Sequence, residues 1–126
     1  MSKQAIESPR APKPVGPYSQ AVAWRDLIFV SGQIPADAAG KMEAVGAAAQ
    51  TEICLKNIAV ILESAGLGLE NVLKTTVFMI DLSQFAAMNE IYSRFFKPPF
   101  PARATVQVSM LPRGAAVEIE AVAGRE

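Results

Sequence analysis

The sequence of 126 residues contains no histidine and a single cysteine, Cys54. Without histidine the chain has no imidazole general base, no Ser-His-Asp or Cys-His catalytic couple and no histidine-containing metal site. One cysteine cannot form a disulfide within the chain or supply a four-cysteine zinc site. Any catalysis must therefore use carboxylates, guanidinium groups, hydroxyls, backbone groups and water, and we expect no bound metal.

An excess of charge of one sign and long apolar runs are also absent. The 12 Lys+Arg and 12 Asp+Glu residues give a formal net charge of zero, which disfavours nucleic acid or an anionic membrane as a partner. No run approaches the roughly 20 apolar residues that span a bilayer. The first residues lack the apolar segment of a signal peptide. We therefore expect a soluble, cytoplasmic protein in which Cys54 is reduced.

Apolar residues are plentiful by contrast. They make up 51% of the chain, which is enough for one domain that buries about two-thirds of its unfolded surface. We assign residues 1–126 to a single domain. Its residues 1–15 form an extended, proline-rich leader, since proline fixes φ and removes an amide donor. The apolar surplus also indicates a partner, of which a further copy of the chain is the simplest.

Hydrophobic periodicity predicts the element order ββαβαββ. The elements are strands at 19–24, 27–31, 72–80, 103–110 and 115–123, with helices at 50–65 and after residue 83. The pattern also allows a short edge strand over residues 41–44. Two helices covering one face of a mixed sheet would give a two-layer α+β fold.

The uncovered face of that sheet is expected to carry the polar strand residues. Alternation assigns to it Arg103, Thr105, Gln107, Glu118 and Glu120. Arg103 offers a planar fork of donors that fits a carboxylate, although a strand-end arginine paired with a glutamate in solvent explains the pattern as well. Glu118 and Glu120 share a face and would act as acid and base if their environments separated their pKa values, or would simply lie in solvent. Glu118 would be better placed for catalysis if it lay across the sheet from Arg103.

Other residues have a functional and a structural interpretation. Tyr18 either lines a pocket or anchors the first strand. Ser31 and Gly32 offer a hydroxyl and an approachable backbone, or form an ordinary strand end. Asn89 is the polar member of an apolar helix face, so its amide needs partners. Cys54 lies on the apolar face of its helix and is assigned to the core.

Taken together, several segments resemble the Rid family, the reactive intermediate deaminases of the YjgF type. They are Gly-Pro-Tyr-Ser-Gln-Ala at 16–21, Val-Ser-Gly-Gln-Ile-Pro at 30–35, Lys-Thr-Thr-Val-Phe at 74–78, Pro-Ala-Arg-Ala at 101–104 and Val-Glu-Ile-Glu-Ala-Val-Ala at 117–123. The likeness runs from about residue 13 to residue 123. The combination of the Pro-Ala-Arg and Val-Glu-Ile-Glu segments is its most specific part.

This resemblance implies a chorismate-mutase-like α+β fold in a homotrimer, with sheets around a central barrel and clefts between subunits. The activity that it implies is hydrolysis of reactive 2-imino acids, such as 2-iminobutanoate and 2-iminopropanoate, to 2-oxo acids and ammonia. No cofactor is implied. The chemistry is compatible with the missing histidines, because imines hydrolyse unaided in water and a positioned general base contributes about 10²–10⁴-fold.

The resemblance also implies roles for single residues. Arg103 would bind the substrate carboxylate, and Glu118 would position or activate the attacking water. The substrate-binding residues would be Tyr18, Ser31, Gly32, Asn89, Arg103 and Thr105. Thr105 stands where RidA members of the family carry a cysteine, which leaves the preferred imine open.

Other functions remain open on this sequence. One is a different deaminase or an amidohydrolase of the wider family, for example of the 2-aminomuconate type, acting at the same site. Another is a non-catalytic or chaperone-like trimer that binds small carboxylates. The ribonuclease activity attributed to relatives is disfavoured by the neutral charge and the absence of acid–base histidines.

Overall fold

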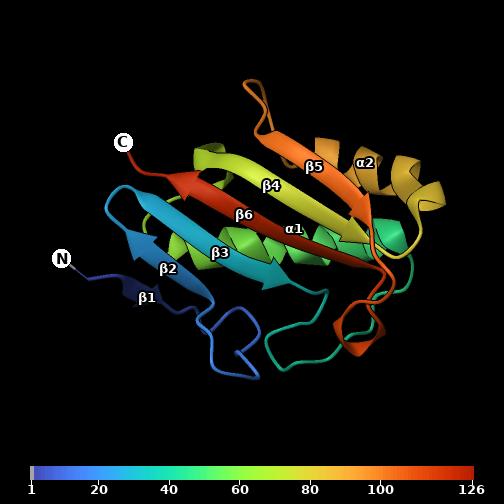
Figure 1. The fold of residues 1–126 in the computed structure, drawn as a ribbon, viewed down its shortest axis with the longest axis horizontal. Coiled ribbons are helices and arrows are strands. Elements are labelled where there is room, and N and C mark those ends of the chain that lie inside the picture. Colours follow the sequence, from blue (N-terminus) through green and yellow to red (C-terminus); the bar gives the residue numbers. More distant parts are fainter. Residues whose placement is uncertain (1) are drawn as a thin grey trace.

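A computed structural model describes residues 2–126, so that Met1, the first residue of the predicted leader, lies outside the described residues. The chain forms a six-stranded mixed sheet with strand order β1-β2-β3-β6-β4-β5 and two helices on one face (Figure 1). The elements are β1 (Gln4–Ile6), β2 (Ala21–Trp24), β3 (Leu27–Gln33), α1 (Ala47–Glu63), β4 (Val72–Met79), α2 (Phe85–Ser93), β5 (Ala102–Gln107) and β6 (Val117–Gly124), with short 3-10 turns at Leu69–Asn71, Leu82–Gln84 and Pro112–Gly114. The predicted α+β class, with a mixed sheet and two helices, is confirmed.

Two local predictions differ from the structure. The leader contains a strand, β1, which pairs antiparallel with β2. The predicted edge strand at 41–44 is wrong, because that segment has no regular structure. Asp37 Oδ1 instead accepts hydrogen bonds from the amides of Ala39 at 2.9 Å and Lys41 at 2.8 Å. The Lys41 amide is therefore satisfied within its own loop rather than by a neighbouring strand.

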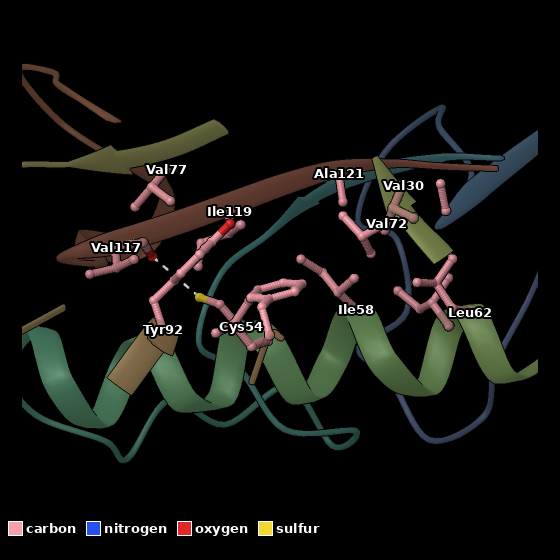
Figure 2. Packing of buried hydrophobic residues seen from close by; sticks show 14 of the residues in the cluster. Val30, Cys54, Ile58, Leu62, Val72, Val77, Tyr92, Val117, Ile119 and Ala121 are labelled. Carbon is pink, nitrogen blue, oxygen red and sulfur yellow. Dashed lines mark hydrogen bonds between the residues drawn. The ribbon is translucent and has the colours of Figure 1, made fainter. Parts of the chain in front are cut away.

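The core lies between α1 and the sheet, as Figure 2 shows. Cys54, Ile58 and Leu62 follow one another at helical spacing and point toward the sheet, Cys54 toward Val117 and Ile119 of β6 and Leu62 toward the end where Val30 and Val72 lie. The thiol of Cys54 lies 3.6 Å from the carbonyl oxygen of Val117. Burial raises the pKa of the Cys54 thiol well above its ordinary value. The assignment of Cys54 to the core is confirmed.

The register of the strands decides which side chains face the helices. In β6, Val117 and Ile119 are buried under the helices, so Glu118 points to the uncovered face. In β4, Thr75 and Val77 are buried on the helix side, and parallel pairing places Arg103 beside Thr75 and Thr105 beside Val77. Arg103, Thr105 and Gln107 therefore point to the helix side.

The prediction that these residues share the uncovered face with Glu118 and Glu120 is wrong. Strand β5 is an edge strand, and β4 lies between it and β6 (Figure 1). The alternating residues Ala104 and Val106 resemble a core face in the sequence, but both are exposed, Val106 to 40%. An exposed edge strand carries no burial pattern that distinguishes its two faces.

The uncovered face is partly apolar. It exposes Phe29 of β3 to 45% together with Val106 of β5. Exposed apolar side chains in one area often mark an interaction surface. The trimeric barrel stays a prediction. Within residues 2–126, none of the helices has the length and apolar character needed to cross a membrane.

Candidate functional site

The side chain of Arg103 extends from β5 toward α2, where its guanidinium lies against two aromatic rings. Its Nη1 donates a hydrogen bond of 2.8 Å to Asn89 Oδ1. Its Cζ lies 4.7 Å from the ring centre of Tyr92 and 5.5 Å from that of Phe85. Phe85, Asn89 and Tyr92 share one face of α2, because residues three and four apart are neighbours on a helix. The side-chain amide of Asn89, a polar group on an apolar helix face, thus has a hydrogen-bond partner in Arg103.

Tyr92 is itself held by a buried hydrogen bond. Its hydroxyl lies 2.7 Å from Thr75 Oγ1, and the two residues are 6% and 1% exposed. Its ring contacts that of Phe96, with 4.7 Å between the ring centres. Burial raises the pKa of the Tyr92 phenol, while the Thr75 hydrogen bond and the Arg103 charge act against that rise. Tyr92 was not among the site residues predicted from the sequence, and its spacing of three residues from the polar Asn89 is the signal that could have indicated it.

Thr105 follows Arg103 by two residues and faces the same side of the sheet. In the part of the chain that the structure describes, its Oγ1 is buried and has no hydrogen-bond partner. An unsatisfied buried hydroxyl costs about 1–3 kcal/mol. The Thr105 hydroxyl is thus shielded within the chain, and its role in substrate binding stays a prediction. We call Arg103, Asn89, Tyr92 and Thr105 the arginine group.

Glu118 lies on the opposite face of the sheet, beside Gly32. The pairing of β3 with β6 is irregular between Val30 and Gln33, and this irregularity brings the backbone of Gly32 under the Glu118 carboxylate. A Cβ atom on Gly32 would overlap with Oε2 of Glu118. Ser31 Oγ donates a hydrogen bond of 2.6 Å to the carbonyl oxygen of Ser19, so its hydroxyl is turned toward the preceding segment.

The surroundings of Glu118 suit a proton acceptor. Burial raises the pKa of this carboxyl, and the like charge of Glu120 raises it further. A general base works best when its pKa approaches the working pH. Tyr18, which is 52% exposed, lines one pocket together with Gly32, and its hydroxyl accepts a hydrogen bond of 3.4 Å from the amide of Val15. We call Tyr18, Ser31, Gly32 and Glu118 the glutamate group.

The predicted site residues therefore fall into two groups on opposite faces of the sheet. Within one chain the arginine group and the glutamate group do not meet, so the condition under which Glu118 would be better placed for catalysis beside Arg103 is not fulfilled. A site containing both would need two copies of the chain. A pocket of about 450 Å³ lies beside the start of β5, is lined by Phe95, Phe96 and the proline-rich segment that follows, and contains none of the predicted site residues. Among residues 2–126, no group of three or more acidic, cysteine or histidine side chains is placed to hold a metal ion.

Comparisons with known proteins cover nearly the whole chain. A family model described as endoribonuclease L-PSP matches residues 8–124. RutC family protein y4sK of Sinorhizobium fredii is 50% identical over 120 residues, covering 94% of this chain and 95% of the relative. The human 2-iminobutanoate/2-iminopropanoate deaminase is 46% identical over 122 residues, covering 96% of this chain and 89% of the relative.

Solved structures of similar proteins have the same fold as this chain. RidA from the Antarctic bacterium Psychrobacter sp. superposes with a TM-score of 0.92 at 41% identity, covering 96% of this chain and 98% of that one. Escherichia coli TdcF, solved with bound serine, superposes with a TM-score of 0.92 at 39% identity, covering 98% of this chain and 99% of that one.

Proposed function

Because the chain belongs to the endoribonuclease L-PSP family, which includes the Rid proteins, we propose that it hydrolyses reactive 2-imino acids to 2-oxo acids and ammonia. The resemblance seen in the sequence is thereby confirmed at the level of the family. The observation that carries the proposal is the exposed guanidinium of Arg103. Among the described residues it bonds only to Asn89, so most of its donors are free for a carboxylate. The human relative named for 2-iminobutanoate and 2-iminopropanoate supports these two substrates.

The proposed reaction needs only the residues at hand and water. Arg103 binds the carboxylate of the imino acid, and Glu118 accepts a proton from a water whose oxygen attacks the imine carbon. Glu118 passes that proton to the imine nitrogen, which gives a neutral carbinolamine. Glu118 then accepts the proton of the carbinolamine hydroxyl and delivers it to the nitrogen while the C–N bond breaks, so that the hydroxyl becomes the carbonyl of the 2-oxo acid and ammonia leaves. Such a positioned base contributes about 10²–10⁴-fold to the rate. No cofactor enters the proposed reaction.

The proposal requires two subunits at each site, because Arg103 and Glu118 face opposite sides of the sheet. The arginine group of one subunit would meet the glutamate group of its neighbour. A homotrimer would have such head-to-tail contacts, in which different surfaces of the same chain meet. The exposed edge strand β5 and the exposed Phe29 on the uncovered face support this arrangement.

The decisive experiment measures 2-oxo acid release from freshly generated 2-iminobutanoate. Hydrogen bonds to a charged group contribute about 1.5–3 kcal/mol, so Arg103→Ala is expected to lower kcat/KM by about 10- to 150-fold. The matched control is Arg10→Ala, because Arg10 forms an exposed ion pair of 3.0 Å with Glu63 and should leave the rate unchanged. Equal rates for wild type and Arg103→Ala would refute the catalytic assignment.

Subunit mixing tests the shared site. Arg103→Ala and Glu118→Ala are each expected to be inactive alone. When they are unfolded together and refolded as an equal mixture, about a quarter of the head-to-tail interfaces would combine an intact Arg103 with an intact Glu118. Activity should then recover to about that fraction of wild type. No recovery in mixed assemblies would refute the shared site.

A binding function is the second candidate, supported by the serine bound to the relative TdcF. Binding of 2-oxobutanoate without turnover of any imine in a substrate panel would favour it. Turnover of a 2-aminomuconate-type substrate alone would favour a different deaminase of the family. The family description names an endoribonuclease, but a formal net charge of zero gives RNA no net electrostatic attraction to the protein. Degradation of RNA by the purified protein that is lost in Arg103→Ala would reverse that judgement.

A further inference from the structure

We propose that Tyr92, held in place by Thr75, is a positioning residue that orients the Arg103 guanidinium for the substrate carboxylate. The inference rests on the proposed function only in assigning the carboxylate to Arg103. It concerns two residues on the helix side of the sheet that are not among the site residues predicted from the sequence.

The geometry joins two strands and a helix. Thr75 of β4 lies directly beside Arg103 of β5 in the parallel register. The hydroxyl of Tyr92, from α2, lies 2.7 Å from the Thr75 hydroxyl, while the ring centre of Tyr92 lies 4.7 Å from the Arg103 Cζ. The ring is thus fixed at its hydroxyl end by the residue next to the arginine.

The exposed edge strand makes such a support necessary. Arg103 lies at the surface, and a long arginine side chain there has many rotamers that would not face a ligand. The Tyr92 ring restricts one face of the guanidinium, and Asn89 restricts one edge through the 2.8 Å hydrogen bond. The opposite edge stays free for a bidentate contact with a carboxylate.

The ring and the hydroxyl of Tyr92 have separable roles. The ring attracts the guanidinium through its π face. This interaction corresponds to about 2-fold in carboxylate affinity at exposed sites and about 30-fold at desolvated sites. The hydroxyl only fixes the ring. Burial favours the neutral phenol, as the raised pKa of Tyr92 indicates, so the guanidinium faces a neutral aromatic ring rather than a phenolate that would bind it as an ion pair.

Three variants separate these roles. Tyr92→Leu removes the ring, Tyr92→Phe removes the hydroxyl, and Thr75→Val with Tyr92→Phe removes both members of the buried hydrogen bond. Replacing both partners by apolar groups of similar shape leaves no unsatisfied buried hydroxyl. Ile58→Ala is the control, since Ile58 is buried in the core on α1 and its truncation lowers stability without touching Arg103.

The measurements are the Kd for 2-oxobutanoate, kcat and KM for 2-iminobutanoate, and Tm. Tyr92→Leu should raise Kd and KM by about 2- to 30-fold with a smaller change in kcat, because the support acts on carboxylate binding in both ground state and transition state. Tyr92→Phe should change Kd by less than about 3-fold. The double variant should regain the Tm lost in Tyr92→Phe. Ile58→Ala should lower Tm with Kd unchanged.

The outcomes distinguish this inference from the proposed function. If Tyr92→Leu lowers Tm but leaves Kd and KM at the values of Ile58→Ala, Tyr92 has a structural role only and the inference is overturned. If wild type binds 2-oxobutanoate through Arg103 but hydrolyses no imine, the proposed function fails while the Kd values still decide the inference. If wild type binds no carboxylate at all, there is no ligand toward which Tyr92 could orient Arg103, and the inference is overturned as well.

Discussion

Replacing Gly32 by alanine tests where the Glu118 carboxylate must lie. A Cβ atom at Gly32 would overlap with Glu118 Oε2 and would come within 3.0 Å of Cδ and 3.3 Å of Cγ. Gly32 is not among the residues with positive φ, so alanine fits its backbone conformation without strain. The substitution therefore acts on the position of Glu118 and on little else.

The structure predicts a small loss of stability and a large loss of activity. Added methylenes in a packed site typically cost about 1–3 kcal/mol, but the half-buried Glu118 can turn toward solvent at about 0.5–1.5 kcal/mol. We therefore expect a loss of about 1 kcal/mol, which lowers Tm by about 4 °C for a chain of this size. Misplacing a catalytic group by about 1 Å costs about 10²-fold in rate. Since the folded state stays dominant at assay temperature, kcat should fall by about that factor.

A matched variant exists in the same chain. A Cβ atom at Gly68 would overlap with the carboxylate of Glu70 in the same way, with Cδ at 3.0 Å, and Glu70 belongs to neither site group. Gly68→Ala should therefore lower Tm by a similar amount without lowering kcat. In addition, Gly32→Ala should cost no stability when introduced into Glu118→Ala, because the colliding atoms are gone. If Gly32→Ala and Gly68→Ala have kcat values within about 3-fold of each other, the assignment of Glu118 as the positioned base is refuted.

Three further predictions follow from single groups. Burial and Glu120 raise the Glu118 pKa, so the folded state binds the carboxyl proton more tightly than the unfolded chain does. The ionised carboxylate therefore destabilises the fold at pH 7, and Glu118→Gln should raise Tm there. This gain in Tm should vanish as the pH falls below the ordinary glutamate pKa of 4.5. Thermal unfolding across pH would contradict this if the gain grew in acid. Burial also raises the pKa of Cys54, so a thiol-reactive disulfide reagent at pH 8 should label it only after denaturant is added. The side chain of Gln20 fixes the leader through hydrogen bonds with Ser8, Ala11 and Pro12. Gln20→Ala should lower the free energy of unfolding, measured in urea, by about 1–3 kcal/mol and should speed proteolysis within residues 7–17. An unchanged digestion pattern would show that other contacts hold the leader.

Elements whose two faces differ in burial could be predicted from the sequence. The stripe that includes Cys54, Ile58 and Leu62 predicted α1, and the alternation of Val117 and Ile119 with glutamates predicted β6 and its buried face. In both cases one face packs against the other element, so the pattern of apolar residues records the contact itself. The chemical identity of Arg103 and Glu118 as candidates was likewise visible in their segments.

The side of β5 that faces α2 could not be predicted from the pattern of apolar residues. Ala104 and Val106 are apolar yet exposed, while Arg103 and Thr105 are polar yet turned toward α2. The signal lay instead in the order of the elements. Strand β4, helix α2 and strand β5 form a βαβ unit, whose strands pair in parallel. Read as such a unit, the sequence would have placed β5 beside β4 and away from Glu118.

The contacts that hold Arg103 also decide which surface the edge strand offers to a neighbour. A one-residue slip of β5 along β4 would turn Arg103 to the uncovered face and bring Ala102 and Ala104 under α2. That slip would break the Asn89 hydrogen bond and the contacts with Tyr92 and Phe85, and would leave small side chains against the helix. The arginine therefore stabilises the register that separates it from the glutamate of its own chain. Under the proposed function, a subunit built this way cannot complete a site alone, and catalysis depends on assembly.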